Sequence, residues 1–187
     1  MPFEAGAPQF GLNDAKIAAW ATGSSYTPPA GSDIMSVQMG SVAMEVITAT
    51  LTGDDKQTAV SSNAIGGTLQ LRWGGLNLTT LGILLGKTPA SSSSQSNVQI
   101  VGGQKMPYVG IILKALSSEV GDTWVFIPKC KIASTFTLVQ MEYGAFAIPE
   151  VTMQIVDDDK WGSINILTHP VDTMITAFPP TFIPALP

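Results

Sequence analysis

The residues with the chemistry of bases, nucleophiles or soft metal ligands are few and stand apart in the chain. There is one histidine, His169, and one cysteine, Cys130. A catalytic base or a metal ligand needs partners at a defined spacing, and with a single distant cysteine no such group can be built. We therefore interpret Cys130 as a buried thiol within a strand. His169 is interpreted as a surface or interface residue at the end of another strand.

An acidic run, Asp157-Asp158-Asp159, raises the possibility of a calcium site. The run lacks the interleaved oxygen donors, the glycine and the distal glutamate of a calcium-binding loop, so we expect a solvated turn. The sequence contains no glycine-rich phosphate loop, no Gly-x-Ser-x-Gly elbow and no paired catalytic carboxylates on one element. These observations predict a protein that is not an enzyme and needs no cofactor.

The composition favours a protein that covers part of its surface with other subunits. Of 187 residues, 45% are hydrophobic and only 12% are charged, whereas soluble domains average about 25% charged residues. A monomer of this kind would leave much uncharged surface in water. The net charge of −5, with Arg72 as the single arginine, excludes a basic nucleic-acid-binding surface.

Targeting signals are not evident. No stretch approaches the roughly 18 unbroken apolar residues of a membrane helix. The start Met-Pro-Phe-Glu lacks the basic and apolar regions of a signal peptide. A single cysteine cannot form an internal disulfide and suits a reducing compartment. We expect a soluble protein, made in a cytoplasm, without a membrane contact.

Most of the elements that must position these residues are predicted to be strands. Apolar alternation and β-branched content predict strands over 35–51, 68–73, 98–101, 106–116, 123–127, 129–141, 149–155 and around 164–166. The apolar register slips twice within 35–51, which indicates bulges or bends. The turn at Thr52–Lys56 and the polar run that follows it to Gly67 are expected to form a loop.

Two short helices are expected. One runs from Asp14, a candidate N-cap, through Trp20. The other is a leucine-rich helix after Asn77, which could cap its start, and Gly86 suits the position just past its end. The predicted organisation is an N-terminal arm over 1–34, a β domain over 35–169 and a proline-rich apolar arm over 170–187.

The C-terminal arm contains Pro170, Pro179, Pro180, Pro184 and Pro187, so it cannot be regular structure. It is nevertheless too apolar for a solvated tail, and we expect it to pack on a neighbouring subunit. The candidate contact residues are Met174, Ile175, Phe178, Phe182, Ile183 and Leu186.

The order of these elements, together with several short phrases, resembles the tail tube proteins (major tail proteins) of tailed bacteriophages. The resemblance covers roughly residues 35–167 and no single chemical signature carries it. The phrases are Glu45-Val46-Ile47-Thr48-Ala49-Thr50-Leu51-Thr52-Gly53-Asp54-Asp55-Lys56, the strand 68–73, the helix ending in Leu85-Gly86-Lys87, Met106-Pro107-Tyr108-Val109-Gly110, Pro128-Lys129-Cys130-Lys131, and Pro149-Glu150-Val151-Thr152 before the aspartate-rich turn.

The resemblance implies a β-sandwich or barrel with one short flanking α-helix. It further implies rings of six subunits, whose strands join into a continuous β-barrel around a channel, and rings that stack into a tube through which DNA is ejected. The implied partners are other copies of the chain, the tape-measure, tail-terminator and baseplate or tail-tip proteins. DNA would pass without specific binding. The protein would reside in the virion tail after synthesis in the bacterial host cytoplasm.

Particular residues follow from this picture. Glu45, Glu142 and Glu150 are the candidate acids of the channel wall, because cationic walls would hold phosphates. The turn with Asp54, Asp55 and Lys56 is the candidate contact between rings.

Two alternative interpretations remain. One is another phage component, either a capsid decoration protein or a tail-terminator protein. The other is a β-sandwich carbohydrate-binding module, in which Trp73, Trp124 and Trp161 would form a stacking platform. Against the second stands the position of Trp73 and Trp124 in strands, which indicates core.

Overall fold

A computed structural model describes the chain over residues 9–21, 25–27, 33–34, 36–53, 56–75, 77–91, 96–117, 122–138, 143 and 148–169. The described residues form a mainly β fold, as predicted, with one short α-helix. In chain order the elements are β1 (Gln9–Ala21), β2 (Ser25–Thr27), β3 (Val37–Gly53), β4 (Lys56–Trp73), α1 (Leu78–Leu85), β5 (Ala90–Ser91), β6 (Ser96–Asn97), β7 (Val109–Ser117), β8 (Asp122–Thr137), β9 (Glu150–Ile155) and β10 (Asn165–His169).

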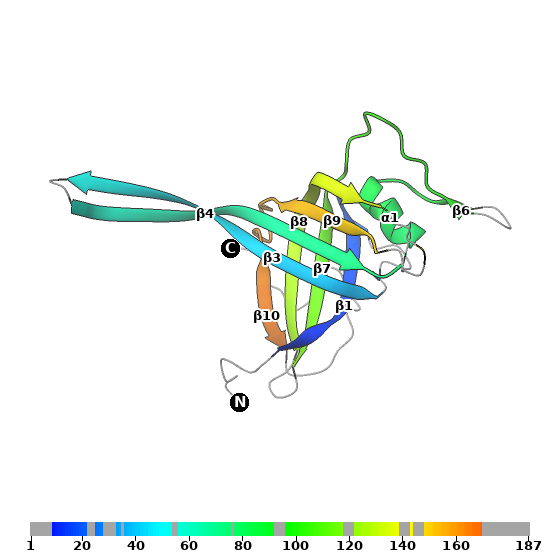
Figure 1. Ribbon diagram of the computed structural model, residues 1–187, viewed down its shortest axis with the longest axis horizontal. Coiled ribbons are helices and arrows are strands. Elements are labelled where there is room, and N and C mark those ends of the chain that lie inside the picture. Colours follow the sequence, from blue (N-terminus) through cyan, green and yellow to red (C-terminus); the bar gives the residue numbers. More distant parts are fainter. Residues whose placement is uncertain are drawn as a thin grey trace.

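One antiparallel sheet contains all the strands except the small β5–β6 pair. Its order is β2-β1-β7-β8-β9-β4-β3, with β10 also paired to β8. The sheet is open, and it folds over on itself, so that β3, β4 and β9 cross over β1, β7, β8 and β10 (Figure 1). Strand β8 takes part in both layers. Its first half pairs with β7 and β10, and its second half, from Cys130 to Thr137, pairs with β9.

The main core lies between the two layers. Leu69, Leu71 and Trp73 of β4 and the alternate residues Val151 and Met153 of β9 are almost completely buried. They meet inward side chains of β1, β7 and β8, and Ile83 and Leu84 of α1 belong to the same cluster. Burying each such side chain stabilises the fold by roughly 1.5–3 kcal/mol, which is why the alternation of these strands fixes the face that they present.

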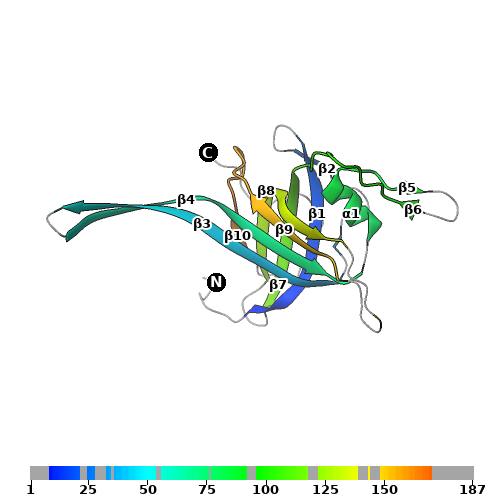
Figure 2. The same ribbon diagram turned by 45° about the horizontal axis from the view of Figure 1, so that its top comes forward.

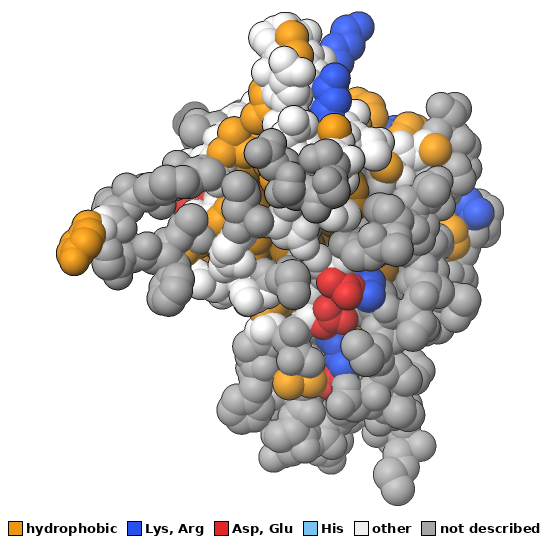
Figure 3. Space-filling model, turned by 90° about the vertical axis from the view of Figure 1, so that its right-hand side faces the viewer, with side chains coloured by type: hydrophobic (Ala, Val, Ile, Leu, Met, Phe, Trp, Pro, Cys, Tyr) orange, Lys and Arg blue, Asp and Glu red, His pale blue; other side chains and the backbone are white. Residues whose placement is uncertain are grey.

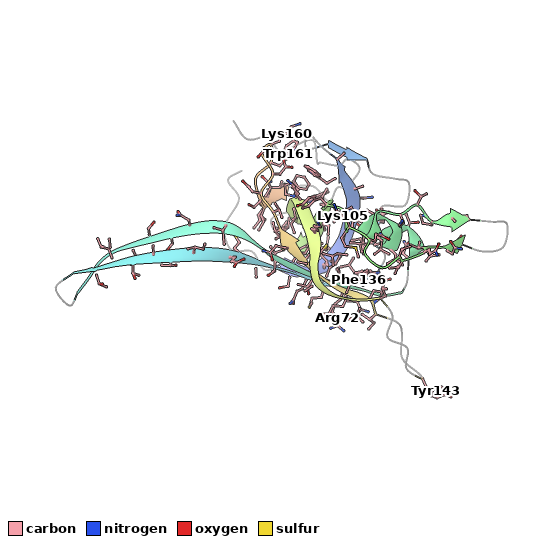
Figure 4. All side chains as sticks on the ribbon, turned by 90° about the horizontal axis from the view of Figure 1, so that it is seen from above. Arg72, Lys105, Phe136, Tyr143, Lys160 and Trp161 are labelled. Carbon is pink, nitrogen blue, oxygen red and sulfur yellow. The ribbon has the colours of Figure 1, made fainter. Side chains whose placement is uncertain are left out.

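A smaller apolar cluster covers the other face of the β7–β8 sheet and contains Trp124, Phe126 and Trp161. Trp161 is held there by the predicted turn, since the Asp158 carboxylate accepts hydrogen bonds from the Lys160 and Trp161 amides at 3.0 and 3.2 Å. Viewed from above, Lys160 and Trp161 lie on the opposite side of the body from Arg72 (Figure 4).

The helix α1 begins and ends where the sequence predicts. The Asn77 side chain accepts hydrogen bonds from the Thr79 and Thr80 amides at 2.8 and 3.5 Å, and Gly86 adopts the left-handed conformation with φ of 65°. A Cβ is disfavoured in that conformation, so glycine is the natural residue after the helix.

The helix expected from Asp14 to Trp20 is wrong, because this segment is part of β1. Ala15 and Ile17 are fully buried, whereas Lys16 points the other way and pairs with Asp33. Helix propensity is a weak preference, and ladder pairing with β7 overrides it here. Residues 9–21 therefore belong to the sheet of the main body.

Other predicted boundaries also change. The polar run before Gly67 is not a loop but the first part of β4, and 98–101 is not a strand. The strands predicted at 123–127 and 129–141 correspond to one strand, β8, which continues through Pro128 and ends at Thr137, and residues 139–141 lie outside the described residues. The strand predicted from Met106 begins at Val109. The predicted irregularity of 35–51 is confirmed, because the β3–β4 register shifts at Glu45/Val46 among other places.

The long β3–β4 hairpin leaves the body at a pair of glycines. Strand β4 pairs with β9 only from Gly67 onward, so among the described strands the earlier residues of β4 pair with β3 alone. Gly66 has φ of +135°, and a Cβ there would lie 2.8 Å from the Ile155 carbonyl oxygen. We call residues 46–53 and 56–65 the hairpin arm. It extends well away from the body (Figures 1 and 2).

Candidate functional site

Four strands, β3, β4, β9 and the second half of β8, form a layer whose outward surface is polar. Because Leu69, Leu71 and Val151 point into the core, the residues between them point outward. We call this surface the polar face. Its polar residues are Ser41 and Glu45 of β3, Thr68, Gln70 and Arg72 of β4, Glu150, Thr152 and Gln154 of β9, and Lys131 and Thr137 of β8, and the apolar Met39 and Ala43 of β3 lie among them.

Both described candidate acids lie on this polar face. The Glu150 carboxylate lies 3.5 Å from the Arg72 Nε atom, and both side chains are about two-fifths exposed, at 45% and 42%. Such an exposed ion pair contributes only about 0–1 kcal/mol to stability. It nevertheless neutralises the charge of Arg72 on this face. The Glu45 carboxylate accepts a hydrogen bond of 3.4 Å from Gln154. Glu142 lies outside the described residues.

The layer is open at both sides. Strand β3 is the last of its sheet, and no described strand pairs with its outer edge. On the opposite side, β7 pairs with β8 only as far as Cys130, so the described residues provide no second partner for β8 from Lys131 to Thr137. Unpaired strand edges present rows of unsatisfied N–H and C=O groups, which favour pairing with another chain.

Lysine and aromatic side chains gather beside the β8 edge. The Lys129 ammonium lies 4.5 Å from the ring centre of Trp20 and 5.1 Å from that of Tyr108. Lys131 lies 5.1 Å from the Tyr108 ring centre. The Trp20 indole N–H donates to the Asp158 carboxylate at 2.9 Å, which fixes its ring. Among the described residues, no carboxylate is recorded within 4 Å of either lysine.

The described side chains of the hairpin arm are exposed, and Lys56 is the one charged residue in the sequence of its two strands. Ile47 is 56% exposed and Val60 55%, and every described side chain of the arm is exposed. The sequence has no charged residue from Val46 to Gly53 or from Gln57 to Gly67. Lysine and proline are the usual protection of a free strand edge, and the arm lacks both there. Of the predicted inter-ring contact, Lys56 is the first residue of β4, whereas Asp54 and Asp55 lie outside the described residues.

The cysteine and the histidine both lie on strands of the main sheet. Cys130 is fully buried, its sulfur lies 3.3 Å from the Val109 carbonyl oxygen, and burial raises its thiol pKa well above the usual range. The buried-thiol interpretation is confirmed. His169 is the last residue of β10, where its backbone faces Asp122. Within the described residues, no three His, Cys, Asp or Glu side chains lie close enough to hold a metal ion.

The three tryptophans proposed as a sugar-stacking platform are buried, with exposures of 1% for Trp73, 1% for Trp124 and 9% for Trp161. They offer no open ring surface for stacking. A pocket of about 470 Å³ lies beside the start of α1, and none of its described lining residues is titratable: they are Gly74, Gly75, Asn77, Leu78, Thr79, Pro89, Ser91 and Ser96. The C-terminal contact residues Met174, Ile175, Phe178, Phe182, Ile183 and Leu186 lie outside the described residues.

Among the described atoms of the surface opposite the arm, charged side chains occupy a few small areas (Figure 3). In the described part of the chain, no helix is long and apolar enough to cross a membrane. Comparison with protein-family models gave no match, and comparison with curated proteins found no similar sequence.

Sequence reasoning did not find the hairpin arm or the cluster beside Lys131. The arm had a signal: a Thr-, Ser- and Val-rich run without charge that ends in Gly66-Gly67. The cluster had none, because Trp20, Tyr108 and Lys131 come from three separate segments.

Proposed function

We propose that the chain is a structural subunit of a bacteriophage tail tube, in which hexameric rings stack around a channel for DNA ejection. The observation that carries this proposal is the four-stranded layer with a polar face and an open strand edge on either side. The resemblance of element order and phrases supplies the tube and the ring of six.

The strand directions of the layer suit closure into a ring. Neighbouring strands from β8 through β9 and β4 to β3 are antiparallel, so β8 and β3 run in opposite directions. When a copy is rotated about a ring axis, its β8 edge meets the β3 edge of the next copy, and the alternation continues without a break. This contact is head-to-tail, and it closes when the rotation returns to the first copy. A closed barrel removes all the free edges.

The polar face would then line the channel. Among its described residues the charges are Arg72 with Glu150, and Lys131 with Glu45, so no excess of cations is present. A wall of neutral and paired residues would let DNA move, because fixed unpaired cations hold phosphates. The overall charge of −5 agrees with this requirement.

The hairpin arm supports assembly between copies. Its β3 strand has eight residues from Val46 to Gly53, which at roughly 3.3 Å per residue reach about 26 Å beyond the body. Exposed apolar side chains on a two-stranded ribbon with a single charged residue would be an aggregation hazard in a monomer. A neighbouring subunit, in the same ring or the next one, would cover them.

The proposal places the protein in the virion tail after synthesis in the host cytoplasm, without enzymatic activity. Its expected partners are further copies of itself, together with tape-measure, tail-terminator and baseplate or tail-tip proteins.

Negative-stain electron microscopy of the purified full-length chain tests the proposal. We expect six-fold rings and hollow tubes, either from the chain alone or after addition of its tail-initiator partner. A chain that stays monomeric at high concentration and gives no rings with its tail partners would refute it. Discrete trimers without tubes would instead favour a decoration protein.

A further inference from the structure

We infer that Glu45 of one copy forms an ion pair with Lys131 of the next copy, and that this pair sets the register of the joint between subunits. The inference rests on the proposed function and names the contact that would hold neighbouring copies together. The two residues lie on the same polar face but at opposite sides of it. Glu45 is on β3 and Lys131 is on β8.

Within the described chain the two side chains form no ion pair, and their backbones are well separated. Lys131 is opposite Gln154 of β9, and Gln154 is opposite Thr68 of β4, which in turn is opposite Ala43 of β3. Three strand spacings therefore separate β8 from β3, which is about 14 Å at roughly 4.8 Å each. Across a joint that brings the β3 edge of one copy beside the β8 edge of the next, the separation falls to one spacing.

Each charge is only weakly engaged inside its own chain. Among the described residues, the Glu45 carboxylate accepts one hydrogen bond, of 3.4 Å from Gln154, which crosses β4 where Gly66 and Gly67 have no side chains. Lys131 rests against the Tyr108 ring beside the open edge. Glu45 is exposed and Lys131 is half-buried, so both charges are accessible to a neighbour at their respective edges.

The pairing tolerates the stagger that a closed barrel requires. Residues that share a face are two apart along a strand, and directly opposite or diagonal residues are within reach of long side chains. A register that places Lys131 beside Ala43, Glu45 or Ile47 of the next copy brings the ammonium and the carboxylate together. Two unpaired strand edges by themselves would permit many registers. The ion pair favours the three registers above, because in any other register the carboxylate and the ammonium are too far apart to interact.

Charge reversal with rescue tests this inference on the full-length chain. Lys131→Glu and Glu45→Lys each place like charges across every joint, and the double variant restores attraction with the signs exchanged. We expect each single variant to raise the lowest concentration that yields tubes by about tenfold or more, and the double variant to return it to within about threefold of the wild type. Tube formation is measured by pelleting and negative-stain microscopy at low and high salt.

Matched controls make the same charge changes at exposed residues that lie on none of the strands of the polar face. Lys87→Glu follows α1 and Asp159→Lys lies in the turn before Trp161, and both should leave tube formation unchanged. Circular dichroism and thermal unfolding verify that every variant folds. Adding salt should weaken wild-type assembly and reduce the defect of the single variants, because mobile ions screen exposed charges.

The outcomes separate this inference from the proposed function. If the wild type forms tubes and Lys131→Glu does so equally well, the ion pair is wrong and the tube proposal stands. If both single variants fail and the double variant fails as well, each charge is needed for another reason, and the pairing is again wrong. A wild type that forms neither rings nor tubes under any condition overturns the proposed function, and the pairing with it.

Discussion

Charging the hairpin arm should abolish assembly while leaving the body folded. We consider the double variant Ile47→Lys/Val60→Lys, since these residues lie on the two strands of the arm and are 56% and 55% exposed in the free chain. Full burial of such a side chain contributes roughly 2 kcal/mol, so covering the exposed half of each would contribute about 1 kcal/mol. Losing both apolar side chains therefore reduces the free energy of each subunit contact by about 2 kcal/mol, which corresponds to a roughly thirtyfold weaker association.

Lysine adds the cost of covering a charge, so this figure is a lower bound for the defect. The free energy of unfolding should change by less than about 0.5 kcal/mol, because exposed side chains away from the core contribute little to stability. Sedimentation measures the assembly and thermal unfolding measures the fold. Ile166→Lys is the matched control, since Ile166 is 70% exposed on β10 of the body. Tubes that form at wild-type concentrations, or a melting temperature that falls in parallel with assembly, would refute a role of the arm in subunit contact.

Three further results are expected. Gly67→Ala should lower the free energy of unfolding by about 1–3 kcal/mol, because its Cβ would collide with a β3 backbone carbonyl. Gly102→Ala should leave it unchanged, because a Cβ there meets open space, and thermal or urea unfolding measures both variants. Native Cys130 should resist alkylation at pH 8 and react fully in denaturant, since burial keeps the thiol protonated; a rapid native reaction would contradict its position. Glu150→Lys should leave tubes intact but slow DNA ejection from phage particles, and unchanged ejection would argue against the polar face as the channel wall.

Local signals were sufficient for several elements. The Asn77 cap and Gly86 define the ends of α1, because capping is decided by the residues within one turn. The alternation after Pro149 predicted β9 and its buried residues, and an isolated cysteine in an apolar strand predicted the buried thiol. The mainly β character follows from the same alternation repeated along the chain.

Distant partners decided the rest. An alanine-rich segment around Ile17 became a strand because β7 offers it a ladder and a core face. The polar run before Gly67 became a strand because β3 pairs with it along its whole length. Neither segment by itself indicates a strand, since the contacts that stabilise it as a strand come from residues far away in the sequence.

The proposed assembly surfaces show the same division. Composition alone predicted that an uncharged surface would be covered by other subunits, and the sequence supplied Glu45 and Glu150 as acids in predicted strands. Only the tertiary structure placed Glu45 and Lys131 at opposite sides of one polar face, with an open edge beside each. Which face a strand residue takes depends on the register with its neighbours, and a shift by one residue would turn every one of these side chains toward the core.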